Sequence, residues 1–359
     1  MNNRRKFFKS LGLLSATALV GGLHPKNSLA KTKIKWKMVT SWPKNFPGLG
    51  AGAETLARYI NNLSGGSLEV KVFGANELVP PLGVFDFVSS GGAEMGHSGA
   101  YYWKGKTEAA QFFSSVPFGM TAQEMNSWLY YGDGIKLWEE VYENFNLIPR
   151  PAGNTGVQMG GWFNKEINTT NDLKGLKMRI PGLGGEVLAR AGGTPFTLAG
   201  AEIFTSLQTG VIDATEWVGP YNDRAFGLHK AAKYYYYPGW HEPGPSLECI
   251  INKDAYNSLS DQHKSIIDIA CKAANVDMIS DYMAKNYQAL EFFNKEKVQI
   301  KQFPAEVLSK LNKISDEILF EISQKNNLSK KVYDSYVNFL SRVRPWTLIS
   351  EDGYLSSFK

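Results

Sequence analysis

The stretch that decides the fold runs from residue 34 to residue 73 and reads IKWKMVTSWPKNFPGLGAGAETLARYINNLSGGSLEVKVF. Its two ends, Ile34–Thr40 and Leu68–Phe73, have the apolar and charged alternation of half-buried strands. Between them, residues 53–63 have the periodicity of an amphipathic helix, and Gly65-Gly66 ends it. This order of strand, helix and strand is the beginning of an α/β pattern.

The alternation continues through the rest of the chain. We expect strands at 95–98, 157–163, 177–180, 247–251 and 298–303, and helices at 84–90, 122–141, 185–191, 201–210, 260–297 and beyond Pro304. Alternating strands and helices predict an α/β fold with largely parallel sheets. In such folds ligands bind beyond the carboxyl ends of the strands, often in a crevice between domains.

The chain begins with the pattern of an export signal. Arg4-Arg5-Lys6-Phe7-Phe8-Lys9 precedes an apolar run from Leu11 to about Leu23, and Ser28-Leu29-Ala30 is a small-x-small cleavage site. The paired arginines match the twin-arginine signature. The apolar run is shorter than the roughly 20 residues that a bilayer core requires. A signal removed after residue 30 is therefore favoured over an uncleaved anchor.

The charge balance depends on this leader. The whole chain has 39 basic and 34 acidic residues, a net charge of +5. The leader contains no acid and the five basic residues Arg4, Arg5, Lys6, Lys9 and Lys26, so the mature chain has 34 residues of each sign. No global positive field remains to attract nucleic acid.

Four stretches gather the polar and aromatic residues that a ligand site requires. They are 153–163 (GNTGVQMGGWF), 176–182 (LKMRIPG), 213–220 (DATEWVGP) and 234–245 (YYYYPGWHEPGP). Arg179 lies in an apolar context before a Pro-Gly turn. Its guanidinium either pairs with a ligand carboxylate through two parallel hydrogen bonds or serves as an exposed or structural residue.

Glu216 follows Thr215 in an apolar run and is not expected to be fully exposed. A buried carboxylate requires a cation or a proton. Its partner is either Arg179, in a structural pair, or a metal ion. Gln158 offers a carbonyl oxygen to such an ion, and backbone carbonyls near Trp217 add more. Oxygen ligands suit a hard cation such as Na⁺ or Ca²⁺.

The tyrosines and Glu242 each have a structural alternative. Tyr101, Tyr102 and the four tyrosines at 234–237 either pack in the core or line a cleft with their hydroxyls. Four consecutive strand residues cannot all face one way, so some of them must meet water or a ligand. Glu242 precedes Pro243-Gly244-Pro245 in a segment that looks like a crossover between domains, and it either bonds a ligand or is solvated.

At these four stretches the chain resembles the substrate-binding proteins of tripartite ATP-independent periplasmic (TRAP) transporters. It is most similar to the subgroup that binds 2-oxo or 2-hydroxy monocarboxylates, such as pyruvate or lactate, together with a metal ion. Residues 41–44 (SWPK) and 77–80 (ELVP) also fit, and the resemblance covers nearly the whole chain. It implies a two-domain α/β periplasmic binding protein that closes on its ligand.

The resemblance also implies the limits of the segments. The signal peptide is expected at 1–30, the first domain with a long connecting helix at 31–155 plus 246–303, the second domain at 156–245, and a helical C-terminal extension at 304–359. In this subgroup a swapped C-terminal helix makes a homodimer, and the apolar face at 307–322 is compatible with that. The implied partners are the small carboxylate and the TRAP membrane subunits in the periplasm, with no enzymatic activity.

The implied site residues come from the same motifs. The substrate-binding set is Arg179, Gln158, Trp217, Glu242, Tyr101, Tyr102 and Asn154, and the metal ligands are Gln158, Glu216 and the backbone carbonyl of Trp217. Arg179 would hold the ligand carboxylate and Glu242 would contact the oxygen at the second carbon. Because Glu216 would repel the ligand, a cation between them resolves the conflict. One Na⁺ or Ca²⁺ is therefore expected.

The chain departs from the family pattern at 241–245, where HEPGP replaces an aromatic residue followed by Glu-Gly-Gly-Pro. Pro243 stiffens the backbone beside the pocket and His241 adds a titratable group. This departure bears on the identity of the ligand more than on its class.

Two other function classes use the same features. An exported oxidoreductase or lyase acting on a small carboxylate would require a cofactor loop, but PGLGAG at 47–52 lacks the Gly-x-Gly-x-x-Gly spacing. The five histidines have no metal-ligand spacing. A ligand sensor for a membrane receptor would use the same cleft.

The two cysteines, Cys249 and Cys271, either form one disulfide or remain buried thiols.

Overall fold

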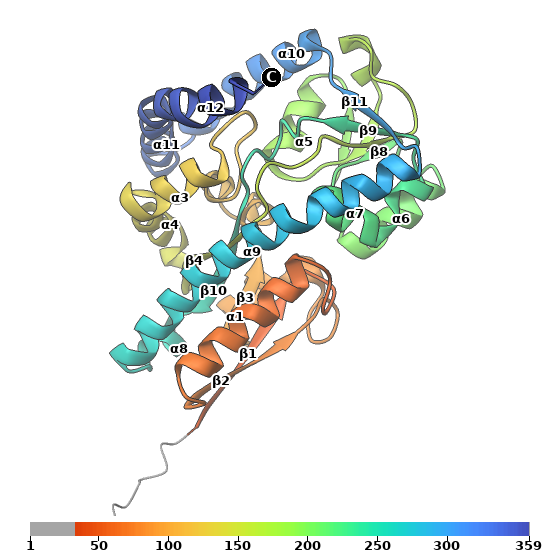
Figure 1. Ribbon diagram of the computed structural model, residues 1–359. Helices are drawn as coiled ribbons and strands as arrows, with labels where there is room; N and C mark the ends of the chain where they lie inside the picture. The colour runs from red at the N-terminus through yellow and green to blue at the C-terminus, as the bar shows by residue number, and fades with distance from the viewer. Residues whose placement is uncertain (1–32, 359) are drawn as a thin grey trace, which may run out of the picture. The chain divides into compact units, whose positions relative to one another are not determined.

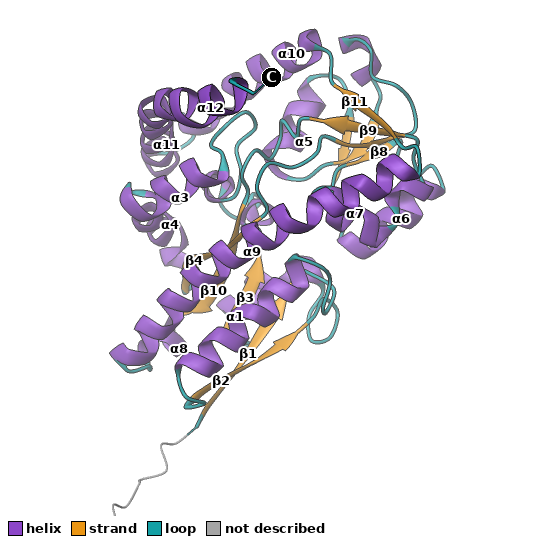
Figure 2. Cartoon of the chain, in the orientation of Figure 1, coloured by secondary structure: helices purple, strands orange, loops and turns teal. Residues whose placement is uncertain are grey.

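The computed structural model describes residues 33–358, so the predicted signal peptide at 1–30 lies outside the described residues. The described residues form a five-stranded sheet and a six-stranded sheet with helices packed on them (Figure 1, Figure 2). Among them, no helix is both long enough and apolar enough to cross a bilayer. The α/β fold class is confirmed.

The first sheet has the order β2-β1-β3-β10-β4. Its strands are β1 (Ile34–Thr40), β2 (Leu68–Phe73), β3 (Met95–Ser98), β4 (Leu147–Asn154) and β10 (Ser246–Asn252). β1 runs parallel to β2 and β3, whereas β10 runs antiparallel to β3 and β4. β4 was not predicted because it contains Pro149 and Pro151, and the sheet tolerates them because β4 is an edge strand.

Two helices cover the core of this sheet. Helix α1 (Leu49–Leu63) buries Ala53, Leu56, Ala57 and Ile60, a spacing that puts all four on one face. Helix α9 (Asp261–Lys295) packs against α1 and β4. Fully burying one Leu or Ile side chain contributes about 1.5–3 kcal/mol, so this face is sufficient to hold α1 in place.

The second sheet has the order β11-β9-β5-β8-β6-β7. Its strands are β5 (Gly161–Phe163), β6 (Lys177–Arg179), β7 (Thr194–Phe196), β8 (Ala214–Thr215), β9 (Tyr234–Tyr237) and β11 (Gln299–Gln302). β6 is parallel to β7 and β8, and β11 is parallel to β9, but β5 is antiparallel to both its neighbours. Both sheets are therefore mixed rather than largely parallel.

Helix α9 links the two sheets. Ser260 caps its first turn by accepting a hydrogen bond from the backbone N–H of His263. Its 35 residues correspond to a length of about 50 Å. It contacts β4 of the first sheet and α7 (Pro220–Phe226), which follows β8 of the second (Figure 1). After α9 the chain forms β11, so this strand joins the second sheet although the predicted segments grouped it with the first domain.

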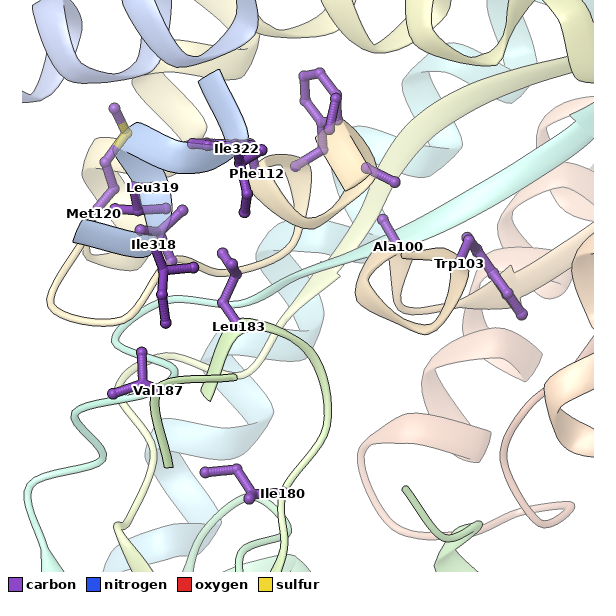
Figure 3. Packing of buried hydrophobic residues seen from close by; sticks show 14 of the residues in the cluster. Ala100, Trp103, Phe112, Met120, Ile180, Leu183, Val187, Ile318, Leu319 and Ile322 are labelled. Carbon is purple, nitrogen blue, oxygen red and sulfur yellow. The ribbon is translucent and has the colours of Figure 1, made fainter. Parts of the chain in front are cut away.

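The C-terminal region is helical, as predicted. It comprises α10 (Ala305–Ser323), α11 (Asn327–Thr347) and the short α12 (Gly353–Ser356). The predicted apolar face of α10 is buried and packs on α5 (Gly182–Arg190). In Figure 3, Ile318 and Leu319 of α10 lie toward Leu183 and Val187 of α5, which starts just after the β6 turn. This packing fixes the segment that follows Arg179.

The remaining helices are α2 (Val84–Ser89), α3 (Ala122–Tyr131), α4 (Gly134–Tyr142), α6 (Gly200–Gln208) and α8 (Lys253–Asn257). The single helix predicted at 122–141 is wrong, because Gly132 adopts an extended conformation and separates α3 from α4. The strand predicted at 157–163 is confirmed only at Gly161–Phe163.

Candidate functional site

Arg179 is the last residue of β6, and its guanidinium is 1% exposed. Its Nε donates to the carbonyl of Leu198 at 3.2 Å and its Nη2 donates to the Tyr102 hydroxyl at 3.2 Å. Its Nη1 donates to the carboxylate of Glu216 and, at 3.4 Å, to the carbonyl of the same residue. Burial alone would lower the pKa of Arg179, but the Glu216 charge raises it above its ordinary value.

Glu216 lies beside Arg179 because β8 and β6 are adjacent parallel strands with Thr215 opposite Arg179. The carboxyl ends of both strands thus meet at one edge of the sheet. Glu216 is also 1% exposed, and its Oε1 accepts from Arg179. Its Oε2 has no hydrogen-bond partner among the described residues. Glu216 therefore forms an ion pair with Arg179, and its second carboxylate oxygen remains without a hydrogen-bond partner in the described part of the chain.

Gln158 enters the site from a loop, not from the strand that was predicted there. The loop is held by backbone hydrogen bonds to three neighbouring segments, including Gln158 N to the Glu242 carbonyl at 3.2 Å and Met159 N to the Val218 carbonyl at 3.0 Å. The side-chain Nε2 donates to Glu242 Oε2 at 2.7 Å and to Thr155 Oγ1 at 3.1 Å. Its Oε1 is buried without a partner among the described residues.

Glu242 is buried on the other side of Gln158. Burial raises the pKa of Glu242 well above its ordinary value, and the Glu216 charge raises it further, whereas Arg179 lowers it. The two carboxyl groups therefore interact within one enclosed space. Glu242 is therefore buried, and the alternative that it is a solvated residue is wrong.

Tyr101 and Tyr102 come from a 3₁₀ turn, η2 (Ala100–Trp103), of the first half of the chain. Their rings meet edge to face at 4.6 Å between centroids. Tyr102 accepts the hydrogen bond from Arg179. Burial raises the pKa of Tyr101 well above its ordinary value, with further contributions from Tyr102 and Glu242. Both tyrosines thus lie against the charged groups of the site.

The tyrosine run at 234–237 does not supply the site with hydroxyls. Tyr235 donates to Asp223 at 2.7 Å, and the Tyr236 hydroxyl accepts from the backbone N–H of Ile167 at 2.9 Å. Tyr237 is 40% exposed. Tyr235 and Tyr236 therefore pack in the core, and Tyr237 is exposed to water.

Trp217 and Asn154 lie next to the site in different roles. The Trp217 ring lies under the Arg179 guanidinium, 5.0 Å from its centre, and packs edge-on against Trp42. Such a cation–π contact stabilises a buried guanidinium. The amide of Asn154 donates to the Gly244 carbonyl at 3.1 Å and accepts from the Gly156 N–H at 2.8 Å. Asn154 therefore positions two loops, and a direct contact with ligand stays a prediction.

His241 was not predicted as a site residue, yet it is 2% exposed and faces Glu216. Its Nε2 lies 3.3 Å from Glu216 Oε2. One atom each of Glu216, His241 and Glu242 lies within 4.8 Å of the other two. The sequence does carry a signal for His241: an imidazole stands beside Glu242 where the family pattern has an aromatic residue.

The site is therefore an enclosed cluster of charges with unsatisfied atoms. Gln158 Oε1, Glu216 Oε2 and Trp217 Nε1 lack hydrogen-bond partners among the described residues. Native proteins rarely leave buried polar atoms unpartnered, so each of these atoms is available to a group that the site receives. The two oxygens can hold a cation, and hard cations such as Na⁺ and Ca²⁺ prefer oxygen ligands. The donor set thus fits the expected ion.

Residues 38–326 match the family described as bacterial extracellular solute-binding protein, family 7. The chain belongs to this family. The family supplies the substrate-binding components of TRAP transporters, not enzymes, and acts outside the cytoplasm. The alternative of an exported oxidoreductase or lyase is thereby excluded.

Three known proteins show how similar this chain is to individual members. A monocarboxylate 2-oxoacid-binding periplasmic protein of Nostoc sp. is 42% identical over 98% of this chain and 97% of its own length. A TRAP periplasmic solute binding protein from Pseudoalteromonas atlantica, solved with bound sodium and pyruvate, is 44% identical with a TM-score of 0.88, covering 91% of this chain and 100% of that one.

The third is a TRAP transporter solute binding protein from Bordetella bronchiseptica. It is 35% identical with a TM-score of 0.89, over 91% of this chain and 97% of that one. It was solved as a mixed occupancy dimer with copurified calcium and picolinate in one site. These two solved structures thus each contain Na⁺ or Ca²⁺ together with a small carboxylate.

Proposed function

We propose that this protein binds a small 2-oxo or 2-hydroxy monocarboxylate of the pyruvate type, together with one Na⁺ or Ca²⁺, and delivers it to TRAP membrane subunits. The names of the relatives support this ligand class. The observation that carries the proposal is the pair of unpartnered buried oxygens, Gln158 Oε1 and Glu216 Oε2, beside a buried guanidinium.

The anion is proposed to bind at the free edge of Arg179. Leu198, Glu216 and Tyr102 engage four of the five N–H groups of the guanidinium, which leaves one on Nη2. A ligand carboxylate meets this N–H and the Tyr102 hydroxyl. Tyr101 then closes the pocket, and Glu242 approaches the oxygen at the second carbon.

The cation is proposed to lie between the ligand and the two unpartnered oxygens. Gln158 Oε1, Glu216 Oε2 and the Trp217 carbonyl are its protein ligands in this proposal. A ligand carboxylate would otherwise meet the Glu216 charge in a space where electrostatic repulsion is poorly screened. The ion removes that repulsion, so anion and cation are expected to bind together.

Ligand entry is proposed to require the two lobes to separate. Tyr101 and Tyr102 come from the proposed first domain (31–155 plus 246–303), and Arg179 and Glu216 from the second (156–245). All of these side chains except Tyr102 are at least nine-tenths buried. Because a ligand cannot reach them from outside in this arrangement, the present structure corresponds to the closed form.

Export and assembly form the remaining part of the proposal. We assign the leader at 1–30 to the twin-arginine route, which would bring the protein to the periplasm.

The C-terminal segment exposes Trp346, Ile349, Leu355 and Phe358 by more than three fifths each. Exposed apolar residues in such density mark an interaction surface, and a homodimer with this segment in its interface would cover them.

The test is a thermal-shift panel on the mature chain from residue 31. Pyruvate, lactate and longer 2-oxo acids are added with Na⁺, with Ca²⁺, or with choline as the only cation. A ligand that binds the folded state stabilises it by about 2.7 kcal/mol at one hundred times its Kd. We expect the melting temperature to rise with a 2-oxo or 2-hydroxy acid only when Na⁺ or Ca²⁺ is present.

Two variants control the test. Arg179→Lys removes the planar fork and is expected to abolish the shift, whereas Arg190→Lys, in an exposed ion pair with Glu321, is expected to retain it. No shift with any carboxylate after unfolding and refolding, which removes copurified ligand, would contradict the proposal. Deletion of the protein should then abolish uptake of the acid; loss of a transcriptional response alone would favour the sensor alternative.

A further inference from the structure

His241 presents a buried imidazole whose Nε2 faces the Glu216 carboxylate. Neither of its ring nitrogens has a hydrogen-bond partner among the described residues, although the side chain is 2% exposed. Leaving a buried polar group unsatisfied costs about 1–3 kcal/mol. Because no hydrogen bond within the described part of the fold satisfies either nitrogen, the ring is available to a group that the site receives.

Packing directs this ring toward the carboxylates. A Cβ atom at Gly184, in the first turn of α5, would lie 2.9 Å from His241 Cβ, so the two backbones are in close contact. On its other side the imidazole meets the Trp240 ring edge to face, with centroids 5.5 Å apart. These contacts leave Nε2 at 3.3 Å from Glu216 Oε2.

The distance matches that of two ligands sharing one ion. Two atoms that bind a divalent cation at roughly 2.1 Å each lie about 3–3.4 Å apart. Glu216 Oε2 itself has no hydrogen-bond partner among the described residues. Glu242 completes a triad whose ligand atoms all lie within 4.8 Å of one another. A single ion among the three would satisfy Glu216 Oε2 and His241 Nε2.

We infer that His241 Nε2 is a nitrogen ligand of the bound ion, and that the site accepts a divalent transition-series cation such as Mn²⁺, Co²⁺ or Zn²⁺ in place of Na⁺ or Ca²⁺. The inference rests on the proposed ion site. Na⁺ and Ca²⁺ gain little from an imidazole, because they bind oxygen. Imidazole with carboxylates is instead a common set for first-row transition metals, whose affinity rises from Mn²⁺ through Co²⁺ to Cu²⁺ and falls again at Zn²⁺.

The experiment compares two metals on metal-stripped mature protein in a sodium-free buffer. Co²⁺ binding is followed by its visible d–d absorption and Ca²⁺ binding by calorimetry, in the wild type and in His241→Gln. Glutamine replaces the nitrogen by an amide oxygen. We expect Co²⁺ affinity to fall at least about tenfold, while Ca²⁺ affinity is retained. A merely structural role of His241 would move both affinities together.

A matched control and a measurement on the unaltered site complete the test. His263→Gln removes a peripheral imidazole that bonds Ser67 and Ser260, and it should leave Co²⁺ binding unchanged. Should His241→Gln fail to fold, pulsed EPR of Mn²⁺ in the His263→Gln protein, with ¹⁵N-labelled histidine, reports the nitrogen directly. Hyperfine coupling to ¹⁵N is expected.

The outcomes separate this inference from the proposed function. Equal Co²⁺ affinity in wild type and His241→Gln, or Mn²⁺ bound without ¹⁵N coupling, would overturn the inference while pyruvate binding with Na⁺ or Ca²⁺ persists. Absence of ligand binding with every cation would overturn the proposed function instead.

Discussion

Arg179 and Glu216 form an ion pair in which each side chain is 1% exposed. The pair is fixed by the register of β6 and β8, which places Arg179 opposite Thr215. Glu216 is therefore expected to contribute to stability in addition to its proposed role in ion binding.

Removing one member of this pair should destabilise the protein strongly. Arg179→Met leaves the Glu216 carboxylate buried without its cation, and we expect the free energy of unfolding to fall by about 3–5 kcal/mol. The double variant Arg179→Met with Glu216→Gln removes the orphan charge, so it should recover part of that loss. Urea unfolding of the three proteins measures this; equal stability of the single and double variants would contradict it.

A methyl group at Gly239 should disturb the loop that carries Gln158. A Cβ atom there would lie 2.3 Å from the Gln158 carbonyl oxygen, which is too close for any side chain. Gly239→Ala is therefore expected to weaken ligand and ion binding at least about tenfold, the effect of roughly 1.4 kcal/mol. Gly105→Ala is the control, because a Cβ at Gly105 meets nothing within 4 Å. Calorimetry with pyruvate and Ca²⁺ compares the two, and equal affinities would refute the expectation.

Glu248 should make stability fall as pH rises toward neutrality. Burial raises its pKa from 4.5 to about 7, although hydrogen bonds from Trp103 and Tyr142 oppose this. The folded state thus keeps a proton that the unfolded chain releases, so the contribution of Glu248 to stability is largest below pH 4.5 and declines up to about pH 7. Each such group contributes at most about 1.4 kcal/mol per pH unit.

The variant Glu248→Gln should flatten that decline. It should do so only in part, because burial also raises the pKa of Asp223 to about 7 and adds a fall over the same range. Unfolding free energies measured by urea titration across the range give the slope. Glu69→Gln, at an exposed ion pair with Lys33, should leave the slope unchanged. An identical slope in wild type and Glu248→Gln would count against this account.

Trp42 should be necessary for the stability of the wall behind the site. Its indole N–H donates to Nδ1 of His97 at 2.8 Å, and both side chains are buried. Trp42→Phe leaves the His97 acceptor unpaired, which costs about 1–3 kcal/mol in addition to the lost volume. Thermal unfolding should show a clear decrease for Trp42→Phe and none for Tyr131→Phe, at a residue that is 93% exposed; comparable changes would contradict the role assigned to the hydrogen bond.

The C-terminal segment should control the oligomeric state. The double variant Trp346→Glu with Ile349→Glu places charges in the exposed apolar patch and is expected to give a monomer in sedimentation experiments, because a charge buried in an interface is costly. Ligand binding should persist, since these residues lie outside the site. Tyr131→Glu, at a residue that is 93% exposed on α3, is the matched control. A wild-type chain that sediments as a monomer would overturn the dimer.

The sequence predicted those parts of the structure whose signals are local. β1 and β2 were predicted with their observed bounds, because alternation along one strand is visible in the chain itself. The gathering of Arg179, Glu216, Gln158 and Glu242 in one place was expected from the family motifs, and the structure brings them together.

The features that were missed depend on distant partners. β4 carries two prolines that only an edge position in the sheet can accommodate. The segment before Gly161 is a loop because its N–H groups bond carbonyls of Glu242, Val218 and Tyr236 from other parts of the chain. His241 belongs to the site because its ring faces Glu216, which comes from another stretch of the chain.

The internal ion pair of Arg179 has a consequence for ligand valence. Glu216 already neutralises the guanidinium, and the raised pKa of Glu242 favours its uncharged form. With Na⁺ in place, the proposed site carries one uncompensated positive charge and is electrically matched to a monoanion, whereas a divalent ion would add a second positive charge. A dicarboxylate of similar size would bring a second negative charge into a space with no solvent to screen it. Discrimination against dianions is thus expected of the site with Na⁺ bound and does not require a steric barrier.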